Sequence, residues 1–132
     1  MKRKILSGLA LVVLAAIMQS AAPHDDQVMT KENGTYIENT TTLGKKVIGY
    51  ADATPVKIYI KKNKVEKVEI LKNQETPKYN AKVKKALQEK WNGQKVKDAA
   101  QLKVDAVTGA TFTSEAIIKN VQLGLEYYQK NK

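Results

Sequence analysis

Apolar and polar residues alternate in the middle of the chain. Apolar residues occupy every second position from Val56 to Ile60, and a second, largely alternating segment runs from Val65 to Ile70. Lys62-Asn63-Lys64 separates the two, and Asn63 tolerates the left-handed backbone of a tight turn. Such alternation is typical of strands with one buried face. The pattern therefore predicts a β-hairpin with a charged, solvated outer face.

Two later segments have helical periodicity instead. A helix is predicted from Glu115 to Tyr128, because apolar residues recur there at spacings of three and four. Its packing face comprises Ile117, Ile118, Val121, Leu125 and Tyr128. A second amphipathic helix is predicted from Asn80 to Trp91, ending at Asn92-Gly93. Its apolar face comprises Val83, Ala86, Leu87 and Trp91. We interpret Trp91 as a core residue rather than one that stacks on a cofactor.

Shorter segments complete the expected sheet. Thr35 to Thr42 is rich in β-branched residues, which favours an extended segment after the turn signal Asn33-Gly34. A further strand is predicted from Lys46 to Tyr50, and a short strand or extended connection from Lys95 to Val104. No internal repeat is present. The sequence predicts an α+β fold, in which an antiparallel sheet with a hairpin is packed by two helices in a single small domain over residues 33–132.

The first 22 residues have the pattern of an export segment. Lys2-Arg3-Lys4 precedes the apolar stretch Ile5–Met18, which is short for a membrane span and suits a signal peptide. Ser20-x-Ala22 offers small residues for cleavage, but Pro23 is unfavourable just after that site. A cleaved signal peptide and an uncleaved membrane anchor both stay open, and a buried first helix fits less well. We predict an exported protein, periplasmic or at the cell surface.

Residues 23–32 are polar and lack periodicity, so we interpret them as a linker in which His24, the only histidine, is solvated. The 132-residue length has room for one domain. There is no cysteine, which excludes disulfides, thiolate metal sites and cysteine nucleophiles. No cluster of His, Asp and Glu has metal-ligand spacing, so no metal site is predicted.

The chain has an excess of positive charge. Its formal net charge is +10, of which the three basic residues Lys2, Arg3 and Lys4 contribute +3, leaving 20 basic and 13 acidic residues afterwards. Excess positive charge suits a solvated surface or an anionic membrane or envelope surface. The scattered lysines, interspersed acids and few aromatic residues argue against nucleic acid as a partner.

The candidate chemistry is concentrated in Asp105–Ser114, directly before the last helix. This stretch holds four hydroxyls, on Thr108, Thr111, Thr113 and Ser114, while Gly109 and Ala110 add little bulk. Gly109 accepts a positive φ. A turn of this kind at a helix start presents N–H groups and the positive end of the helix dipole to a phosphate. The ordinary alternative is that Thr113 or Ser114 caps the helix.

The string Asp105-x-x-Thr108-Gly109-Ala110-Thr111 resembles the flavinylation motif Asp-x-x-(Ser/Thr)-Gly-Ala-Thr of the FMN-binding domain family. That family includes FMN-carrying subunits of sodium-pumping NADH:quinone reductases and Rnf-type complexes. Its members receive FMN from FAD through a Mg²⁺-dependent flavin transferase, as a phosphodiester on the threonine that closes the motif. The resemblance implies covalent FMN on Thr111. The surrounding cofactor site would comprise Asp105, Thr108, Gly109, Ala110 and Thr113.

The likeness runs from about Gly34 to Tyr128, and it includes Gly49-Tyr50. Glu75-Thr76-Pro77 resembles the family's Glu-Thr-Pro-Gly loop near the flavin, which adds Glu75, Thr76 and Lys78 to the candidate cofactor-binding residues. Lys78 stands where glycine is usual, and Asn80 stands at another position where glycine is frequent. Lys78 would crowd the pocket or meet the flavin or its phosphate as a cation. For Glu75, a cofactor contact and an ordinary strand-to-helix turn both stay open.

The resemblance implies an exported flavoprotein electron carrier, a component of a redox system rather than a stand-alone enzyme, with no catalytic residue of its own. Its partners would be the flavin transferase and redox proteins or a membrane electron-transfer complex. The alternative is a non-redox extracytoplasmic binding module of the same fold, which takes an anionic ligand or an envelope partner at the same turn.

Overall fold

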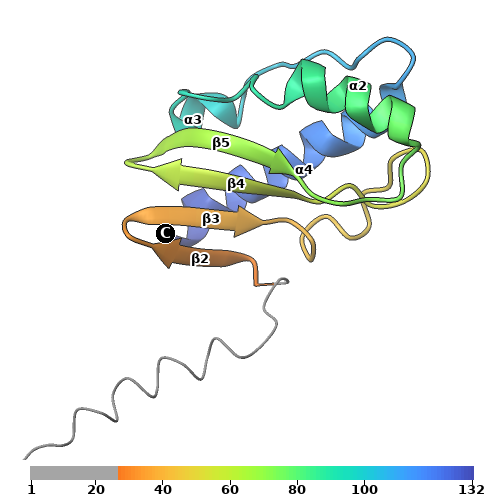
Figure 1. The fold of residues 1–132 in the computed structure, drawn as a ribbon. Helices are drawn as coiled ribbons and strands as arrows, with labels where there is room; N and C mark the ends of the chain where they lie inside the picture. Colours follow the sequence, from red (N-terminus) through yellow and green to blue (C-terminus); the bar gives the residue numbers. More distant parts are fainter. Residues whose placement is uncertain (1–26) are drawn as a thin grey trace, which may run out of the picture.

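The computed structural model describes residues 27–132, so the predicted export segment and His24 lie outside the described residues. A four-stranded antiparallel sheet in the order β2-β3-β4-β5 forms the centre of the molecule (Figure 1). The strands are β2 (Met29–Glu32), β3 (Thr35–Asn39), β4 (Val56–Lys61) and β5 (Lys64–Ile70). Each strand pairs with the next along the chain, which confirms the predicted antiparallel sheet.

The predicted hairpin is formed by β4 and β5. Its turn is tighter than expected, because Lys64 already belongs to β5 and only Lys62 and Asn63 connect the strands. Both have positive φ, 53° and 61°, as two-residue hairpin turns require. The alternating apolar residues are buried on one face: Val56, Ile58, Ile60, Val65, Val68 and Ile70.

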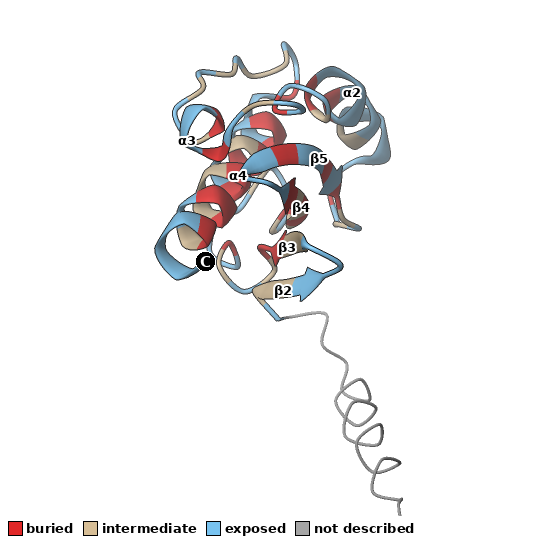
Figure 2. Ribbon diagram, turned by 90° about the vertical axis from the view of Figure 1, so that its left-hand side faces the viewer, coloured by how far each residue is buried: buried red, intermediate tan, exposed pale blue. Residues whose placement is uncertain are grey.

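Helices cover that face of the sheet. They are α2 (Pro77–Leu87), the single-turn α3 (Val96–Ala99) and the long α4 (Thr111–Asn131). α4 packs on β3 and β4, while α2 and α3 contact α4 (Figures 1 and 2). Its buried stripe includes Ile117, Val121, Leu125 and Tyr128, as the periodicity predicted. The predicted small α+β domain is confirmed.

Two predicted features before the hairpin differ from the structure. Met29–Glu32, predicted as part of a linker, forms β2 through pairing with β3, a long-range effect that the polar sequence does not reveal. Lys46–Tyr50, predicted as a strand, lies in the loop 40–55 and contributes only the isolated bridge between Ile48 and Ala53.

Several helix boundaries also differ. The predicted helix Asn80–Trp91 starts earlier, at Pro77, because proline is accommodated in the first helical turn. It ends at Leu87. Ala86, predicted on the apolar face, is exposed, whereas Trp91 is buried after the end of the helix as a core residue. The segment 95–104, predicted as a short strand or an extended connection, contains α3, and residues 102–104 after it belong to neither helix nor strand. Within residues 27–132, the structure has no helix with the length and apolar character needed to cross a bilayer.

Candidate functional site

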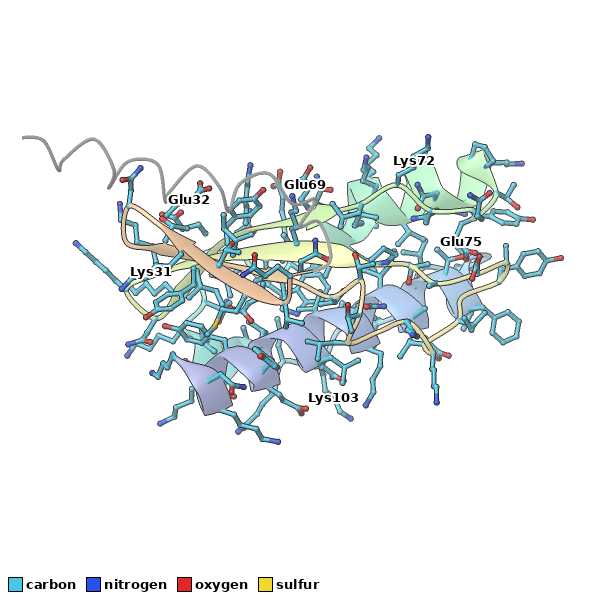
Figure 3. All side chains as sticks on the ribbon, turned by 90° about the horizontal axis from the view of Figure 1, so that it is seen from below. Lys31, Glu32, Glu69, Lys72, Glu75 and Lys103 are labelled. Atoms are coloured by element: carbon cyan, nitrogen blue, oxygen red, sulfur yellow. The ribbon has the colours of Figure 1, made fainter. Side chains whose placement is uncertain are left out.

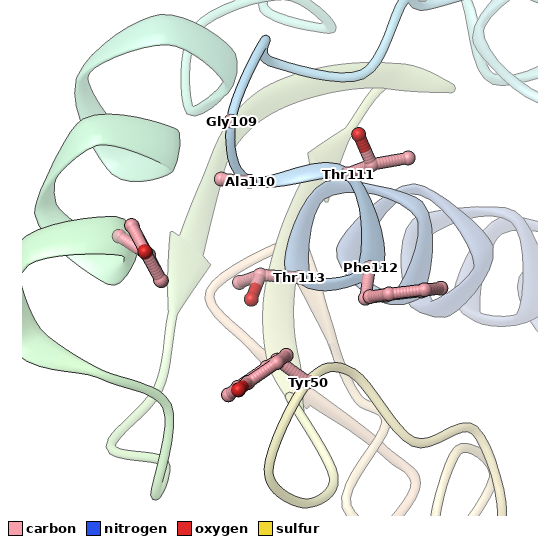
Figure 4. A pocket seen from close by; sticks show the side chains of 7 residues that line it. Tyr50, Gly109, Ala110, Thr111, Phe112 and Thr113 are labelled. Atoms are coloured by element: carbon pink, nitrogen blue, oxygen red, sulfur yellow. The ribbon is translucent and has the colours of Figure 1, made fainter.

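The start of α4 forms one wall of a cavity of about 330 Å³. The turn contributes residues 109–113, while Tyr50 comes from the loop 40–55 and Tyr79 from the first turn of α2 (Figure 4). The rings of Tyr50 and Tyr79 meet edge to face, with centroids 6.5 Å apart. Tyr50 and Phe112 are each 65% exposed. These side chains therefore offer aromatic surface to a ligand in the cavity.

In the described part of the chain, the N-cap of α4 makes no side-chain capping bond. The helix begins at Thr111 with Ala110 as its N-cap, so the predicted capping by Thr113 or Ser114 is wrong. Both residues are already inside the helix. The N–H groups of Thr111, Phe112 and Thr113 make no backbone hydrogen bond in the described part of the chain. They are the free donors expected at an uncapped helix start, beside the positive end of the helix dipole.

Ser114 has a different role from the predicted cap. Its Oγ donates to the carbonyl oxygen of Ala110 at 2.8 Å and accepts the N–H of Val107 at 2.9 Å. These two bonds close the turn between the extended segment 102–107 and α4. Gly109 lies at the tip of this turn with φ +86°, a conformation that favours glycine.

A cation lies beside the same turn. A Cβ placed on Gly109 would lie 3.5 Å from the ammonium nitrogen of Lys82. Lys82 follows Lys78 by one helical turn on α2, and the sequence analysis did not single it out. The sequence signal that was available is the i to i+4 spacing, which puts the two lysines on neighbouring positions of one helix face.

Glu75 holds the wall of the cavity that contains Tyr50. Its carboxylate accepts the N–H groups of Tyr50 at 2.7 Å, Ala51 at 2.6 Å and Asp52 at 3.1 Å. It also accepts the hydroxyl of Thr113. The side chain is only 4% exposed and lies between the loop 40–55 and the start of α4 (Figure 3). One carboxylate therefore fixes the position of the Tyr50 loop relative to the helix start.

The donors around Glu75 determine its charge. Burial alone would raise the pKa of Glu75, but the Thr113 hydroxyl and the N–H groups of Tyr50, Ala51 and Asp52 together outweigh this effect and hold it below the usual 4.5. Hydrogen bonds to a carboxylate favour its charged form. Glu75 is therefore ionised at neutral pH, which suits an acceptor of four hydrogen bonds.

Gly49 allows this close approach of backbone and carboxylate. A Cβ at position 49 would lie 2.5 Å from Oε1 of Glu75 and 3.2 Å from Cγ2 of Thr54. The first distance is too short for any side chain, so glycine is required here by space rather than by φ. This gives a physical reason for the Gly49-Tyr50 pair that the sequence analysis singled out by resemblance.

A family model for the FMN-binding domain matches residues 49–126, more than half of the chain. The chain belongs to the FMN-binding domain family. Comparison with curated proteins and with solved structures gives no match. The matched region begins at Gly49 and includes the Tyr50 loop, Glu75 and the turn before Thr111. Membership makes this a flavin-binding protein, with FMN as the implied cofactor.

The cavity has the chemistry that FMN requires. Free N–H groups at the start of α4 and the Lys82 ammonium are suitable partners for a phosphate. Tyr50, Tyr79 and Phe112 supply aromatic surface for a flat ring system. The cavity volume falls in the range of roughly 300–1,000 Å³ that is usual for small-molecule sites.

The FMN-binding domain brings only some of the predicted site residues together. Gly109, Ala110, Thr111 and Thr113 line the cavity, and Glu75 stands behind it. Tyr50 was noted only as part of the Gly49-Tyr50 resemblance, and Tyr79 and Phe112 were not predicted, although they flank or lie within the motifs.

Other predicted residues lie elsewhere. Asp105 is exposed and lines a separate cavity with Lys90 and Lys103. Thr76 is the N-cap of α2 without a side-chain capping bond, and Lys78 is exposed on the first turn of α2.

Two further residues of the predicted motifs lie near the cavity without lining it. Thr108 is exposed on the turn, one residue before the lining starts. Asn80, which replaces a glycine that is frequent in the family, accepts the amide of Asn73 at 3.1 Å. Asn73 in turn accepts the N–H of Glu75 at 3.0 Å. Asn80 thus helps to order the loop that carries Glu75.

Proposed function

We propose that this FMN-binding domain is an exported electron carrier whose FMN is attached covalently to Thr111 through a phosphodiester. The observation that carries the proposal is the uncapped first turn of α4, which begins with the exposed Thr111 beside an aromatic cavity. The motif Asp105-x-x-Thr108-Gly109-Ala110-Thr111 supports the same residue by its resemblance to the family's acceptor motif.

Attachment transfers an FMN group from FAD to the threonine. The Thr111 oxygen forms a bond to the phosphorus on the FMN side of FAD, the pyrophosphate bond breaks, and AMP leaves. The hydroxyl proton passes to a base of the flavin transferase, because threonine is a weak nucleophile without activation. The product carries FMN minus water, and no electron is exchanged. Exposure of Thr111 leaves the hydroxyl accessible to such a transferase.

This chain's own residues would then bind and orient the cofactor. The N–H groups of the first turn of α4 and the Lys82 ammonium hold the phosphate. Tyr50, fixed in place by Glu75, packs against the ring system together with Phe112. The bound flavin supplies one- and two-electron transfer, and the protein sets its position and surroundings.

The proposed location follows from the export pattern of residues 1–22. A covalent link prevents loss of FMN in a compartment that has no flavin supply. The partners are a flavin transferase and redox proteins or a membrane electron-transfer complex. N-terminal sequencing of host-derived protein should begin near Pro23, or the intact chain should fractionate with membranes. A full-length soluble protein in the cytoplasm would contradict export.

Co-expression with an active flavin transferase tests the attachment. We expect the intact mass to rise by one FMN minus water, and peptide mapping to place the addition on Thr111. Thr111→Val should abolish the addition, while Thr108→Ser, which keeps the hydroxyl that the motif has at this neighbouring exposed position, should keep it.

Two results would contradict the proposal. Flavin that survives Thr111→Val and maps to another hydroxyl would show that the acceptor is misassigned. An unmodified wild type beside an active transferase would favour the non-redox binding module instead.

A further inference from the structure

A second cavity lies at the opposite end of the molecule from Thr111. Its volume is about 410 Å³, and it is formed by the β4–β5 turn, the start of α3 and the last turn of α4. Figure 1 shows these three segments together at one end, while the start of α4 lies at the other. The two cavities are separated by α4, whose 21 residues span about 30 Å.

Asn63 ties the three segments of this second cavity together. Its Oδ1 accepts the Tyr128 hydroxyl at 2.6 Å and the Lys132 ammonium at 3.0 Å. Its carbonyl oxygen accepts the N–H of Val96 at 2.9 Å. The cavity is therefore built by specific contacts rather than by the chance proximity of surface side chains.

The cavity is strongly cationic. Five of its nine lining residues are lysines, namely Lys62, Lys64, Lys95, Lys97 and Lys132, and none is acidic. All five are exposed, whereas Val96 and Tyr128 are each 3% exposed and form an apolar floor. An anionic group would meet the ammonium groups at the rim, and an apolar portion would meet the floor.

We propose that this lysine cavity docks the domain on a membrane surface that contains anionic phospholipids. Protein interfaces are depleted in lysine, and this cavity has five lysines. Lysines are effective on anionic bilayers because each flexible ammonium adds attraction without requiring a fixed geometry.

Docking in this way fixes the orientation of the domain. The end of α4 faces the lipid, and the start of α4 with Thr111 lies about 30 Å away along the helix. The aromatic cavity then faces the aqueous compartment, where a soluble partner can reach it. The inference concerns the lysine cavity alone and does not depend on whether FMN is attached.

The absence of cysteine from the sequence allows single-site labelling of the full-length chain. One environment-sensitive dye is placed by Asn131→Cys at the end of α4, and another by Ala81→Cys on α2, both at exposed positions. Emission is measured with vesicles of phosphatidylcholine alone and with vesicles that contain phosphatidylglycerol. Both labelled proteins carry the same N-terminal segment, so whether that segment inserts does not depend on which position is labelled.

We expect a blue shift at position 131 with the anionic vesicles only, weakened by salt, and little change at position 81. The triple variant Lys62→Gln, Lys95→Gln, Lys97→Gln should lower the docking equilibrium constant roughly a hundredfold. The matched triple Lys84→Gln, Lys85→Gln, Lys119→Gln removes the same charge from exposed positions outside the cavity and should change it far less.

Three results would overturn the proposal. Equal loss in both triple variants would mean that net charge, not the cavity, drives binding. A response to millimolar inorganic phosphate without vesicles, with none to anionic vesicles, would identify a free-anion site. If circular dichroism shows folded protein and neither probe gives a response, an anionic membrane is excluded as the partner of this cavity. An acidic protein would then be the partner to test.

Discussion

Two buried glutamates show how differently this fold treats the same side chain. Glu75 is 4% exposed and accepts four hydrogen bonds beside the aromatic cavity. Glu38 is 0% exposed in the middle of the sheet, and neither of its carboxyl oxygens has a hydrogen-bond partner in the described part of the chain. It lies on β3 opposite Ile58 and beneath Gly124 of α4.

The pKa values of the two groups move in opposite directions. Burial raises the pKa of Glu38 from 4.5 to about 8, because no donor compensates for the lost water. The pKa of Glu75 is lowered, since its hydrogen bonds outweigh burial. Glu75 therefore acts at neutral pH as an ionised acceptor that organises a site, while Glu38 is protonated and acts as a packing group. The number of donors, rather than burial, decides which role a buried carboxyl takes.

The largest effect is expected from Glu75→Ala. Removal of the carboxylate leaves three backbone N–H groups and the Thr113 hydroxyl without their acceptor, and hydrogen bonds to charged groups contribute about 1.5–3 kcal/mol each. We expect the free energy of unfolding to fall by about 3–5 kcal/mol at pH 7, measured by urea denaturation. Flavin attachment should fall as well, because the Tyr50 loop loses its anchor.

Glu89→Ala is the matched control, since Glu89 is exposed after the end of α2. It should change the unfolding free energy by less than about 0.5 kcal/mol. The stability that Glu75 contributes is present above its unfolded pKa of 4.5 and is lost as the pH falls through its lower folded pKa. If the loss of unfolding free energy in Glu75→Ala stays constant down to pH 2, Glu75 is not an ionised hydrogen-bond acceptor.

Glu38→Gln should have the opposite effect from Glu75→Ala and stabilise the protein at neutral pH. Below pH 4.5 the carboxyl is protonated in both folded and unfolded chains, so it has little effect on the pH dependence. Between pH 4.5 and about 8 only the unfolded chain loses the proton, which lowers folding stability by about 1.4 kcal/mol per pH unit. Above pH 8 the loss is constant.

We compare the unfolding free energy of Glu38→Gln with that of wild type at each pH. This difference should favour the variant by about 3 kcal/mol more at pH 7 than at pH 4. Urea denaturation across this pH range measures it. The control Glu66→Gln, at an exposed position on β5, should show no such pH dependence. A gain that is equal at pH 4 and pH 8 would mean that Glu38 is not the titrating group.

Gly49→Ala tests the space around the Glu75 carboxylate. The new methyl would lie 2.5 Å from Oε1 of Glu75, so the loop or the carboxylate must move. We expect a loss of about 2 kcal/mol, typical of overpacking, measured by thermal or urea unfolding. In a Glu75→Asp background the shorter side chain leaves room, so the same substitution should have a smaller effect. Additive losses in the double variant would show that the two residues are independent.

The comparison also shows how far sequence patterns reach. The hairpin and the buried face of α4 follow from alternation and periodicity, because each is decided within one local segment. β2 and the position of Glu38 do not, since they depend on pairing with residues far along the chain. Tyr36 and Glu38 occupy core-facing positions of β3, where neither residue is aliphatic. The extended segment Thr35 to Thr42 was therefore predicted from its β-branched residues and not from an apolar pattern.

The same limit applies to the site. The glycine turn and Thr111 are recognisable as one contiguous string, and the structure places them on one cavity. The role of Glu75 depends on N–H groups about 25 residues earlier in the chain, which composition cannot reveal. The predicted capping by Thr113 is wrong because Thr113 already lies inside the helix, and its hydroxyl donates to this distant carboxylate.

Thr113→Val should have the smallest effect, and it separates the hydrogen bond to Glu75 from the attachment of FMN to Thr111. The substitution keeps the shape of the side chain and removes one of four donors to Glu75, so we expect a loss of about 1–2 kcal/mol in the urea unfolding free energy. The pKa of Glu75 should rise, because the hydroxyl is the largest of the effects that lower it. Thr113→Ser keeps the hydroxyl and should restore most of both quantities.

With a flavin transferase present, both variants should still gain the mass of FMN minus water, since Thr113 is buried and bonded to Glu75 while Thr111 is exposed. Loss of the modification in a folded Thr113→Val, with Thr113→Ser still modified, would mean that the hydroxyl of Thr113 takes part in attachment and is more than a donor to Glu75.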